Sequence, residues 1–332
     1  MLETTIALVT FAALVLYALM GGADFGGGMW DLFAHGPRAA RQRKLIADAI
    51  APIWEANHVW LILVIVLLFT AFPRGFAAMM TALHIPLMAM LVGIVLRGSA
   101  FVFRKYDAKD DAVQRRWSTI FGVSSLITPF LQGLSLGALA SGAIRVEGHQ
   151  VTTGFFAGWT GGFAVACGAY ALTLFAFLAA VYLTVDAHGD AEVQEDFRRR
   201  ALISGVVLAP IAAVVFLAAR VGGAPQMYHD LTRWWAPYLL IATSGCALTA
   251  LVALWRRRYR AARVAAIGQV TLILVGWCSA QFPHVIVPDM DIYTHAAPAI
   301  TLRLLVIALG AGALVLLPSL YYLFYVFKKR PS

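Results

Sequence analysis

Long apolar runs separated by short polar connections dominate the chain. A membrane-spanning helix needs roughly 20 mostly apolar residues, and the runs that meet this length cover residues 4–23, 52–72, 75–96, 117–141, 158–184, 201–220, 233–254, 264–282 and 298–327. The connections are too short to form a second domain. The pattern therefore predicts an all-α polytopic membrane protein with nine transmembrane helices, built as a single integral membrane domain over residues 1–332.

Composition supports this interpretation. Of the 332 residues, 61% are hydrophobic and 13% are charged, whereas soluble domains have about 45–50% and about 25%. These values argue against a soluble domain, a disordered chain and a nucleic-acid binder. The three cysteines lie inside apolar runs without metal-ligand spacing, so the sequence indicates no metal site.

The basic residues are distributed unevenly between alternate connections. Most of the 26 Lys and Arg residues fall in 24–51, 97–116, 185–200, 255–263 and the C-terminal residues Lys328, Lys329 and Arg330. The five on the other side are Arg74, Arg145, Arg220, Arg233 and Arg303. Because cytoplasmic connections carry the excess of Lys and Arg, this split predicts a periplasmic N-terminus and a cytoplasmic C-terminus. The net charge of +9 is then mainly a topology signal.

The order of the spans is typical of a weak tandem repeat. Spans one and five each end in an aspartate, Asp24 and Asp186, and each leads three further spans. We expect two parallel four-helix units, 1–141 and 158–282, followed by a ninth helix at 298–327.

Ionisable side chains at membrane depth are functional candidates, because leaving them in lipid costs several kcal/mol. Asp24 stands in GGADFGGGMWD at the end of the first span. Its glycines allow either a close approach of backbones or a break in the helix. Two roles remain open for Asp24: proton uptake, or the capping of the next segment from a C-terminal turn.

Glu55 and His58 lie near the cytoplasmic start of the second span, in IAPIWEANHVWLI. Their spacing of i, i+3 places them on one helix face. A carboxylate beside an imidazole can relay protons. The alternative is that Glu55 pairs with a loop arginine at the headgroup level, while Trp54 and Trp60 act as interfacial anchors.

Two further features concern packing and haem ligation. Gly133 and Gly137 form a GxxxG pattern in the fourth span, which indicates a close helix contact. His84 is expected deep in the third span, roughly 9 Å from the depth of His58 at ~1.5 Å per residue. A haem ligated by both histidines is therefore not expected.

Several segments resemble subunit II of the cytochrome bd-type quinol oxidases, including the cyanide-insensitive branch. They are GGADFGGGMWDL, IAPIWEANHVWL, FPRGFAAMM, LRGSAFVFR and AQFPHVIVPDMDIYTHAAP, in this order along the chain. The resemblance implies two four-helix bundles plus one peripheral helix. Residues 140–260 are only generically similar.

The resemblance also implies a function. A bacterial inner-membrane oxidase of this kind oxidises quinol and reduces O2 to water, and its haems, two b-type and one d-type or a b-type in its place, lie in subunit I. The chain would be a haem-free partner of subunit I that helps proton uptake from the cytoplasm. A structural quinone is bound to subunit II in some members, and a small accessory subunit is left open.

Carried over residue by residue, the family's two acidic positions fall on Asp24 and Glu55. Many members have Asp where this chain has Glu55, and Gln where it has His58. We therefore expect the proton pathway to use Glu55, Asp24 and His58, with no catalytic residue in this chain. Trp54, Trp60, Gly133 and Gly137 are expected to make structural or subunit contacts.

Two other classes of function remain. A secondary transporter also uses glycine-broken helices and repeats. A purely structural scaffold would use its carboxylates to hold a subunit contact.

Overall fold

The computed structural model describes residues 1–51, 54–106, 111–148 and 150–328. Within this part of the chain, nine helices are long and apolar enough to cross a membrane, as predicted. They are α1 (Leu2–Leu32), α3 (Trp54–Ala71), α5 (His84–Tyr106), α6 (Asp111–Ala140), α7 (Gly162–Asp186), α8 (Ala191–Ala218), α10 (Ala236–Trp255), α11 (Tyr259–Gln281) and α12 (Ala299–Lys328). Three of the basic residues on which the predicted membrane orientation rests lie outside the described residues: Lys109, Lys329 and Arg330.

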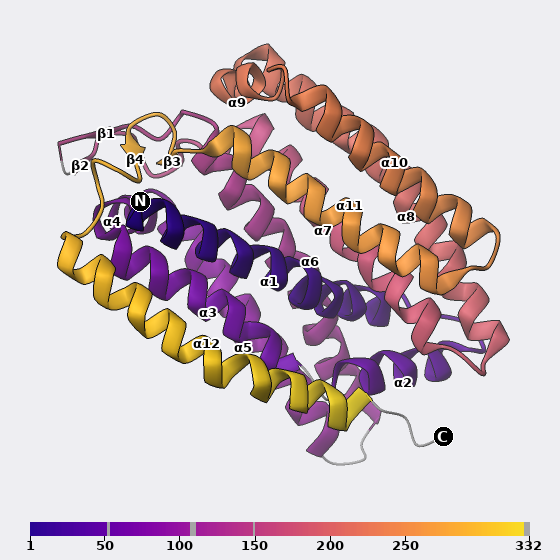
Figure 1. Ribbon diagram of the computed structural model, residues 1–332. Helices are drawn as coiled ribbons and strands as arrows, with labels where there is room; N and C mark the ends of the chain where they lie inside the picture. The colour runs from indigo at the N-terminus through magenta and orange to yellow at the C-terminus, as the bar shows by residue number, and fades with distance from the viewer. Residues whose placement is uncertain (52–53, 107–110, 149, 329–332) are drawn as a thin grey trace.

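Short elements cover the two ends of the helix assembly. They are α2 (Ala39–Ile50), α4 (Pro73–Ala82), the π turn η1 (Ala219–Gly223), α9 (Pro225–Asp230) and four strands, β1 (Val146–Glu147), β2 (Gln150–Val151), β3 (His284–Ile286) and β4 (Met290–Asp291). β1 pairs with β2, and β3 with β4, both antiparallel. The strands and the N-terminus lie at one end, here the hairpin end, and α2 and the last turns of α12 lie at the other, here the α2 end (Figure 1). Which end faces the cytoplasm stays a prediction.

The spanning helices form the two predicted four-helix bundles and one peripheral helix (Figure 1). The first bundle contains α1, α3, α5 and α6, and the second contains α7, α8, α10 and α11. α7 packs against both α1 and α6, so it joins the bundles. α12 lies against α1 and α3. The proposed tandem repeat stays a prediction.

The first span is longer than predicted. α1 continues from Leu2 to Leu32, straight through the glycine-rich segment. The capping interpretation of Asp24 is therefore wrong, because no turn occurs there. The glycines allow close packing instead: a Cβ at Gly26 would overlap the carbonyl oxygen of Phe175 in α7, and one at Gly28 would overlap the hydroxyl of Ser125 in α6.

The third span also differs from the prediction of 75–96. Pro73 starts a separate helix, α4, and the backbone leaves helical geometry at Leu83 (φ −111°, ψ 19°). The span then runs from His84 to Arg104. Apolar residues continue beyond Arg97, so the helix does as well. Arg97 therefore lies within the span, and His84 lies at its first residue instead of deep inside it.

α2 is held against the second bundle at the α2 end. Two residues of α2 itself, Ile46 and Ile50, are buried. Arg38 makes an ion pair of 2.7 Å with Asp196 of α8, and Arg41 pairs with Asp190 at the start of the same helix. α2 thus fixes the chain just before α3 begins.

Candidate functional site

A buried ion pair joins α1 to α5. Arg97 Nη2 donates to Asp24 Oδ1 at 2.6 Å, and the two side chains are 2% and 3% exposed. Arg97 Nε donates to the Ser125 hydroxyl at 3.2 Å. The guanidinium carbon also lies 4.7 Å and 5.1 Å from the ring centroids of Phe25 and Phe121. The charge of Asp24 is therefore offset inside the protein, by a residue that the sequence analysis assigned to a connection.

A second ion pair lies two helical turns further along the same two helices. Arg104 Nη1 donates to Asp31 Oδ2 at 2.9 Å, and the side chain of Asp31 is fully buried. Arg43, from α2, donates to the carbonyl oxygens of Asp31 and Ala34. The sequence analysis did not single out Asp31. Its spacing from Asp24, matched by that of Arg104 from Arg97, is the signal that could have identified it.

Polar groups of α3 face the first ion pair. Asn57 Nδ2 donates to the carbonyl oxygen of Met20 at 3.4 Å. The imidazole centroid of His58 lies 6.2 Å from the ring centroids of both Tyr17 and Phe25, which flank Asp24 along α1. The structure therefore brings His58 and Asp24 into one cluster between α1 and α3.

Three buried atoms of this cluster have no hydrogen-bond partner among the described residues. They are Asp24 Oδ2, Asn57 Oδ1 and His58 Nδ1. Buried polar groups in native proteins are normally satisfied, and ordered water supplies the bond where protein does not. The cluster thus contains a carboxylate and an imidazole with free acceptor or donor atoms, and both are groups that can exchange protons.

Glu55 occupies a different environment from Asp24. Its side chain is exposed on this chain, while Asn57, half a turn further on, is buried. Trp54 turns inward, with its ring 5.8 Å from that of Phe101. In the part of the chain that the structure describes, Glu55 makes no ion pair, so the predicted pairing with a loop arginine is not observed there. Glu55 and His58 share one side of α3, with Glu55 at the surface and His58 partly buried.

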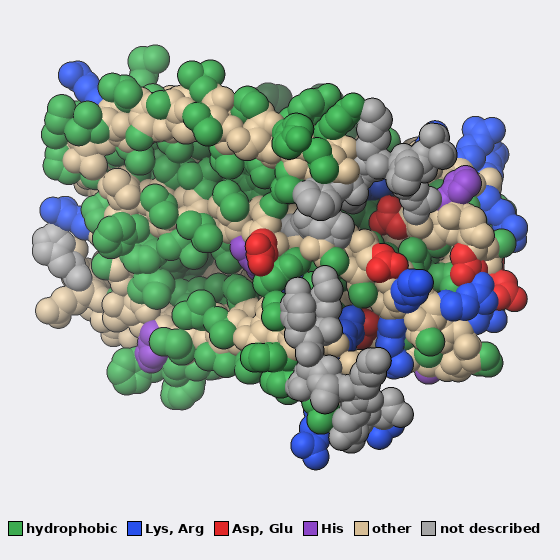
Figure 2. All heavy atoms as spheres, turned by 90° about the horizontal axis from the view of Figure 1, so that it is seen from below, with side chains coloured by type: hydrophobic (Ala, Val, Ile, Leu, Met, Phe, Trp, Pro, Cys, Tyr) green, Lys and Arg blue, Asp and Glu red, His purple; other side chains and the backbone are tan. Residues whose placement is uncertain are grey.

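The surface that α3 shares with α5 and α12 is largely apolar. Figure 2 shows hydrophobic side chains over most of this view, with most of the acidic and basic side chains toward one end. Exposed members include Ile62, Phe69, Met88, Leu91 and Val95. Glu55 is therefore a carboxylate at the border of an apolar surface.

The remaining predicted contact residues lie inside the chain. Trp60 is 8% exposed within the core, so it is not an interfacial anchor. Gly133 and Gly137 face α7: a Cβ at Gly137 would lie 2.8 Å from Cys167 Cβ, and one at Gly133 would overlap the Cys167 carbonyl oxygen. This contact joins the two bundles of one chain.

His58 and His84 lie toward opposite ends of the first bundle. His58 follows the start of α3 at the α2 end, whereas His84 begins α5 at the hairpin end and bonds to the Thr81 carbonyl oxygen at 2.9 Å. Together they cannot ligate one haem. Within the described residues, no group of three or more His, Cys, Asp and Glu side chains is placed to hold a metal ion.

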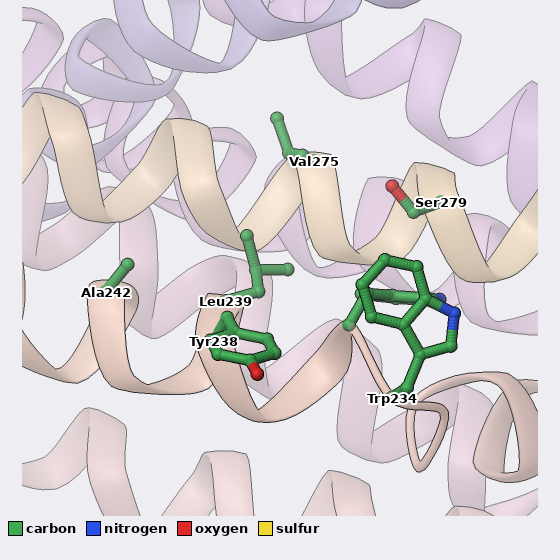
Figure 3. A pocket seen from close by; sticks show the side chains of 7 residues that line it. Trp234, Tyr238, Leu239, Ala242, Val275 and Ser279 are labelled. Atoms are coloured by element: carbon green, nitrogen blue, oxygen red, sulfur yellow. The ribbon is translucent and has the colours of Figure 1, made fainter.

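A groove of about 520 Å³ lies between α10 and α11 toward the hairpin end. Figure 3 shows its lining of mainly aromatic and aliphatic side chains: Trp234, Trp235, Tyr238, Leu239, Ala242, Val275 and Ser279. The Ser279 hydroxyl is one polar group among them. The groove suits an apolar ring or chain and is far from the Asp24 cluster.

An exposed ion pair at the hairpin end leads to a prediction of pH dependence. The Arg145 guanidinium, through its hydrogen bonds, holds the pKa of Asp289 below its ordinary value near 3.8. Asp289 also accepts from the Val146 amide at 2.8 Å. A lowered folded-state pKa means that the stabilisation is present above the ordinary value and is lost as the pH falls through the folded one. We expect the Val146 amide to lose protection from hydrogen exchange below about pH 4.

The matching variant is Asp289→Asn. It should reduce Val146 protection at neutral pH and show little further change on acidification. Equal acid sensitivity in both proteins would mean that another group controls this connection.

The sequence of the chain is similar to known proteins along most of its length. The family model for cytochrome bd terminal oxidase subunit II matches residues 2–327. Cytochrome bd ubiquinol oxidase subunit 2 of Bacillus subtilis is 28% identical over 330 residues, which cover 95% of this chain and 93% of that relative. Cytochrome bd-I ubiquinol oxidase subunit 2 of Escherichia coli K12 is 28% identical over 129 residues, or 39% of this chain and 33% of that relative.

A solved structure has the same fold. A chain of the bd oxidase from Geobacillus thermodenitrificans matches with a TM-score of 0.78 at 22% identity, over 99% of both chains. This likeness concerns the fold, whereas the family model matches the sequence along almost its whole length. The chain therefore belongs to the cytochrome bd terminal oxidase subunit II family.

Proposed function

We propose that this chain is the haem-free subunit of an oxidase that oxidises quinol and reduces O2 to water. Its role is to support a haem-bearing subunit I and to admit protons toward the site of O2 reduction. The single observation that carries the proton role is the set of three buried polar atoms without partners on Asp24, Asn57 and His58, in two helices that pack against each other. The similarity to cytochrome bd ubiquinol oxidase subunit 2 of B. subtilis supports the oxidase assignment.

In this proposal Glu55 is the entry carboxylate. It stands at the surface of α3 near the α2 end, where a proton from water reaches it first. His58, on the same side of the helix and one turn deeper, passes the proton inward through Nδ1 and bound water. Asp24 Oδ2 receives it, while Arg97 holds Oδ1 in place.

The direction of transfer follows from the location of Glu55. O2 reduction consumes protons, and quinol oxidation near the opposite face releases them. If the α2 end faces the cytoplasm, as the distribution of Lys and Arg predicts, uptake through Glu55 moves charge across the membrane without pumping. This arrangement belongs to a bacterial inner membrane with the N-terminus on the periplasmic side.

The apolar surface of α3, α5 and α12 is the proposed contact with subunit I. A carboxylate at the border of such a surface becomes partly enclosed when a second membrane protein covers it. Glu55 would then lie at the subunit boundary, at the entrance of the route that leads to His58 and Asp24.

The test is Glu55→Gln in the assembled oxidase. General acid–base groups typically contribute about 10²–10⁴-fold, so we expect quinol-oxidase turnover to fall by about 10²-fold with the haem spectrum unchanged. Glu55→Asp is the matched control, because it keeps the carboxylate and should retain most activity. Full turnover and full membrane potential in Glu55→Gln would refute the role given to Glu55.

A structural role for Asp24 is the second candidate, and the buried ion pair with Arg97 specifically favours it. The variant Asp24→Asn distinguishes the structural role of Asp24 from its role in proton transfer. A slowed rate with normal assembly supports proton transfer, whereas lost assembly with a normal rate per assembled complex supports the scaffold. The transporter alternative loses its main argument, because α1 is unbroken through its glycines.

A further inference from the structure

A second groove lies between α10 and α11 at the α2 end, on the bundle that does not contain Glu55. Its volume is about 320 Å³. It is lined by Leu248, Thr249, Val252, Ala253, Arg256, Arg258 and Ala261. Apart from Thr249, whose hydroxyl donates to the Gly245 carbonyl oxygen at 2.7 Å, the α10 residues form an apolar wall within a membrane-spanning helix. The two arginines close the groove where the helix ends.

The turn between α10 and α11 presents these two arginines together. Arg257, between them, has a left-handed backbone (φ 58°), which is uncommon for a residue with a side chain. Its guanidinium pairs with Glu195 of α8 at 3.4 Å. The amide of Arg258 donates to the Ala253 carbonyl oxygen at 2.7 Å and closes the turn. Arg257 is thus held by α8, while Arg256 and Arg258 border the groove.

The two groove arginines are not neutralised within the chain. Among the described residues, neither Arg256 nor Arg258 makes an ion pair with a carboxylate. By contrast, Arg257 pairs with Glu195, and Arg263 lies over the Tyr182 ring at 4.4 Å. Two guanidinium groups without an acidic partner, at one end of an apolar groove, match a ligand with an anionic head and an apolar tail.

We propose that this groove binds an anionic phospholipid. The phosphodiester lies between Arg256 and Arg258, since guanidinium groups bind phosphate oxygens through paired, charge-assisted hydrogen bonds. One acyl chain follows Leu248 and Val252 along α10. Basic pockets at membrane-spanning helices recognise such headgroups. Trp255, 75% exposed beside the arginines, places an aromatic ring at the headgroup level.

The apolar lining of the groove favours a lipid over free phosphate. Leu248, Val252, Ala253 and Ala261 offer no hydrogen bond to an inorganic anion, whereas an acyl chain would cover them. The site is separate from the proposed proton route, so each can fail without the other.

The test measures lipid retained by the purified oxidase complex. The complex is stripped in detergent, mixed with phosphatidylglycerol, and examined by native mass spectrometry and thermal unfolding. We expect Arg256→Gln/Arg258→Gln to weaken phosphatidylglycerol binding at least about tenfold, the loss of about 1.4 kcal/mol. Arg260→Gln/Arg303→Gln removes the same charge outside the groove and should change binding by less than about twofold.

A third variant keeps both arginines. Ala261→Trp fills the groove and should also weaken binding if an acyl chain occupies it. Equal losses in the two double variants would overturn the proposal, because they would indicate general attraction to a basic surface. Equal stabilisation by phosphatidylcholine, or by inorganic phosphate alone, would overturn it as well.

Discussion

Replacing Arg97 with Met is expected to destabilise the protein by about 3–5 kcal/mol, the usual cost of leaving one member of a buried ion pair unpaired. Arg97 contributes the 2.6 Å bond to Asp24, a bond to Ser125 and contacts with two aromatic rings. Without it, the Asp24 carboxylate of α1 stays buried with no cation from α5 beside it. The first bundle should then assemble poorly, with a low yield of complex and a lower temperature of unfolding.

The double variant Asp24→Asn/Arg97→Met isolates the charge effect. It removes both members, so no unpaired charge remains, and it should recover a large part of the lost stability. The interaction energy from the full double-mutant cycle measures the pair itself. If the single and double variants lose the same stability, Arg97 acts by packing and the ion pair is unimportant.

Replacing Gly26 with Leu is expected to have the second largest effect, preventing normal packing of α1 against α7. A Cβ at this position would already overlap the carbonyl oxygen of Phe175 and lie 2.6 Å from the Ala179 Cβ. Backbone cannot yield as a flexible side chain does, and overpacking typically costs about 1–3 kcal/mol or more. We expect little assembled complex in membranes, measured as haem-bearing oxidase per cell.

Gly245→Leu is the matched control. Gly245 lies inside α10, and a Cβ there meets no atom within 4 Å. Assembly should be unchanged or slightly improved, since glycine is a poor helix former. Equal damage from both variants would mean that a large side chain added to any spanning helix disturbs assembly, and that the α1–α7 contact has no special role.

The number of spans and their order were predictable, because long apolar runs leave few alternatives in a membrane. The residues at which the spans begin and end were harder to predict. Arg97 was assigned to a connection because it is charged, yet Phe101, Val102 and Phe103 follow it, and their apolar character extends α5 around a buried arginine. A charged residue that finds a partner inside the protein does not end a helix, and one sequence does not reveal the partner.

The conformation of the glycine-rich segment of α1 was also not predictable from the sequence. Glycines allow both a broken helix and a close helix contact, and the sequence alone left both open. The choice depends on α7, whose Phe175 and Ala179 lie against Gly22 and Gly26 from far along the chain. The candidate residues were predictable by type, since a carboxylate in a span is unusual. Their environments were not: Asp24 is buried and paired, whereas Glu55 is exposed.

The difference between the two carboxylates determines their proposed order. A surface carboxylate can exchange protons with water, and a buried one can hand them on only through an intermediate group. His58, between them, has the position for that step. The order also predicts that Glu55 substitutions slow proton entry, while Asp24→Asn slows the later transfer to the buried carboxylate.

The most direct measurement is proton uptake by oriented oxidase in proteoliposomes, with a pH-sensitive dye on the side of the α2 end. The reduced enzyme is mixed with O2, and the uptake rate is compared among the wild type, Glu55→Gln and Glu55→Asp. We predict rapid uptake from this side in the wild type and in Glu55→Asp, and uptake slowed about 10²-fold in Glu55→Gln. Uptake at the wild-type rate in Glu55→Gln, or uptake from the hairpin end, would contradict the account.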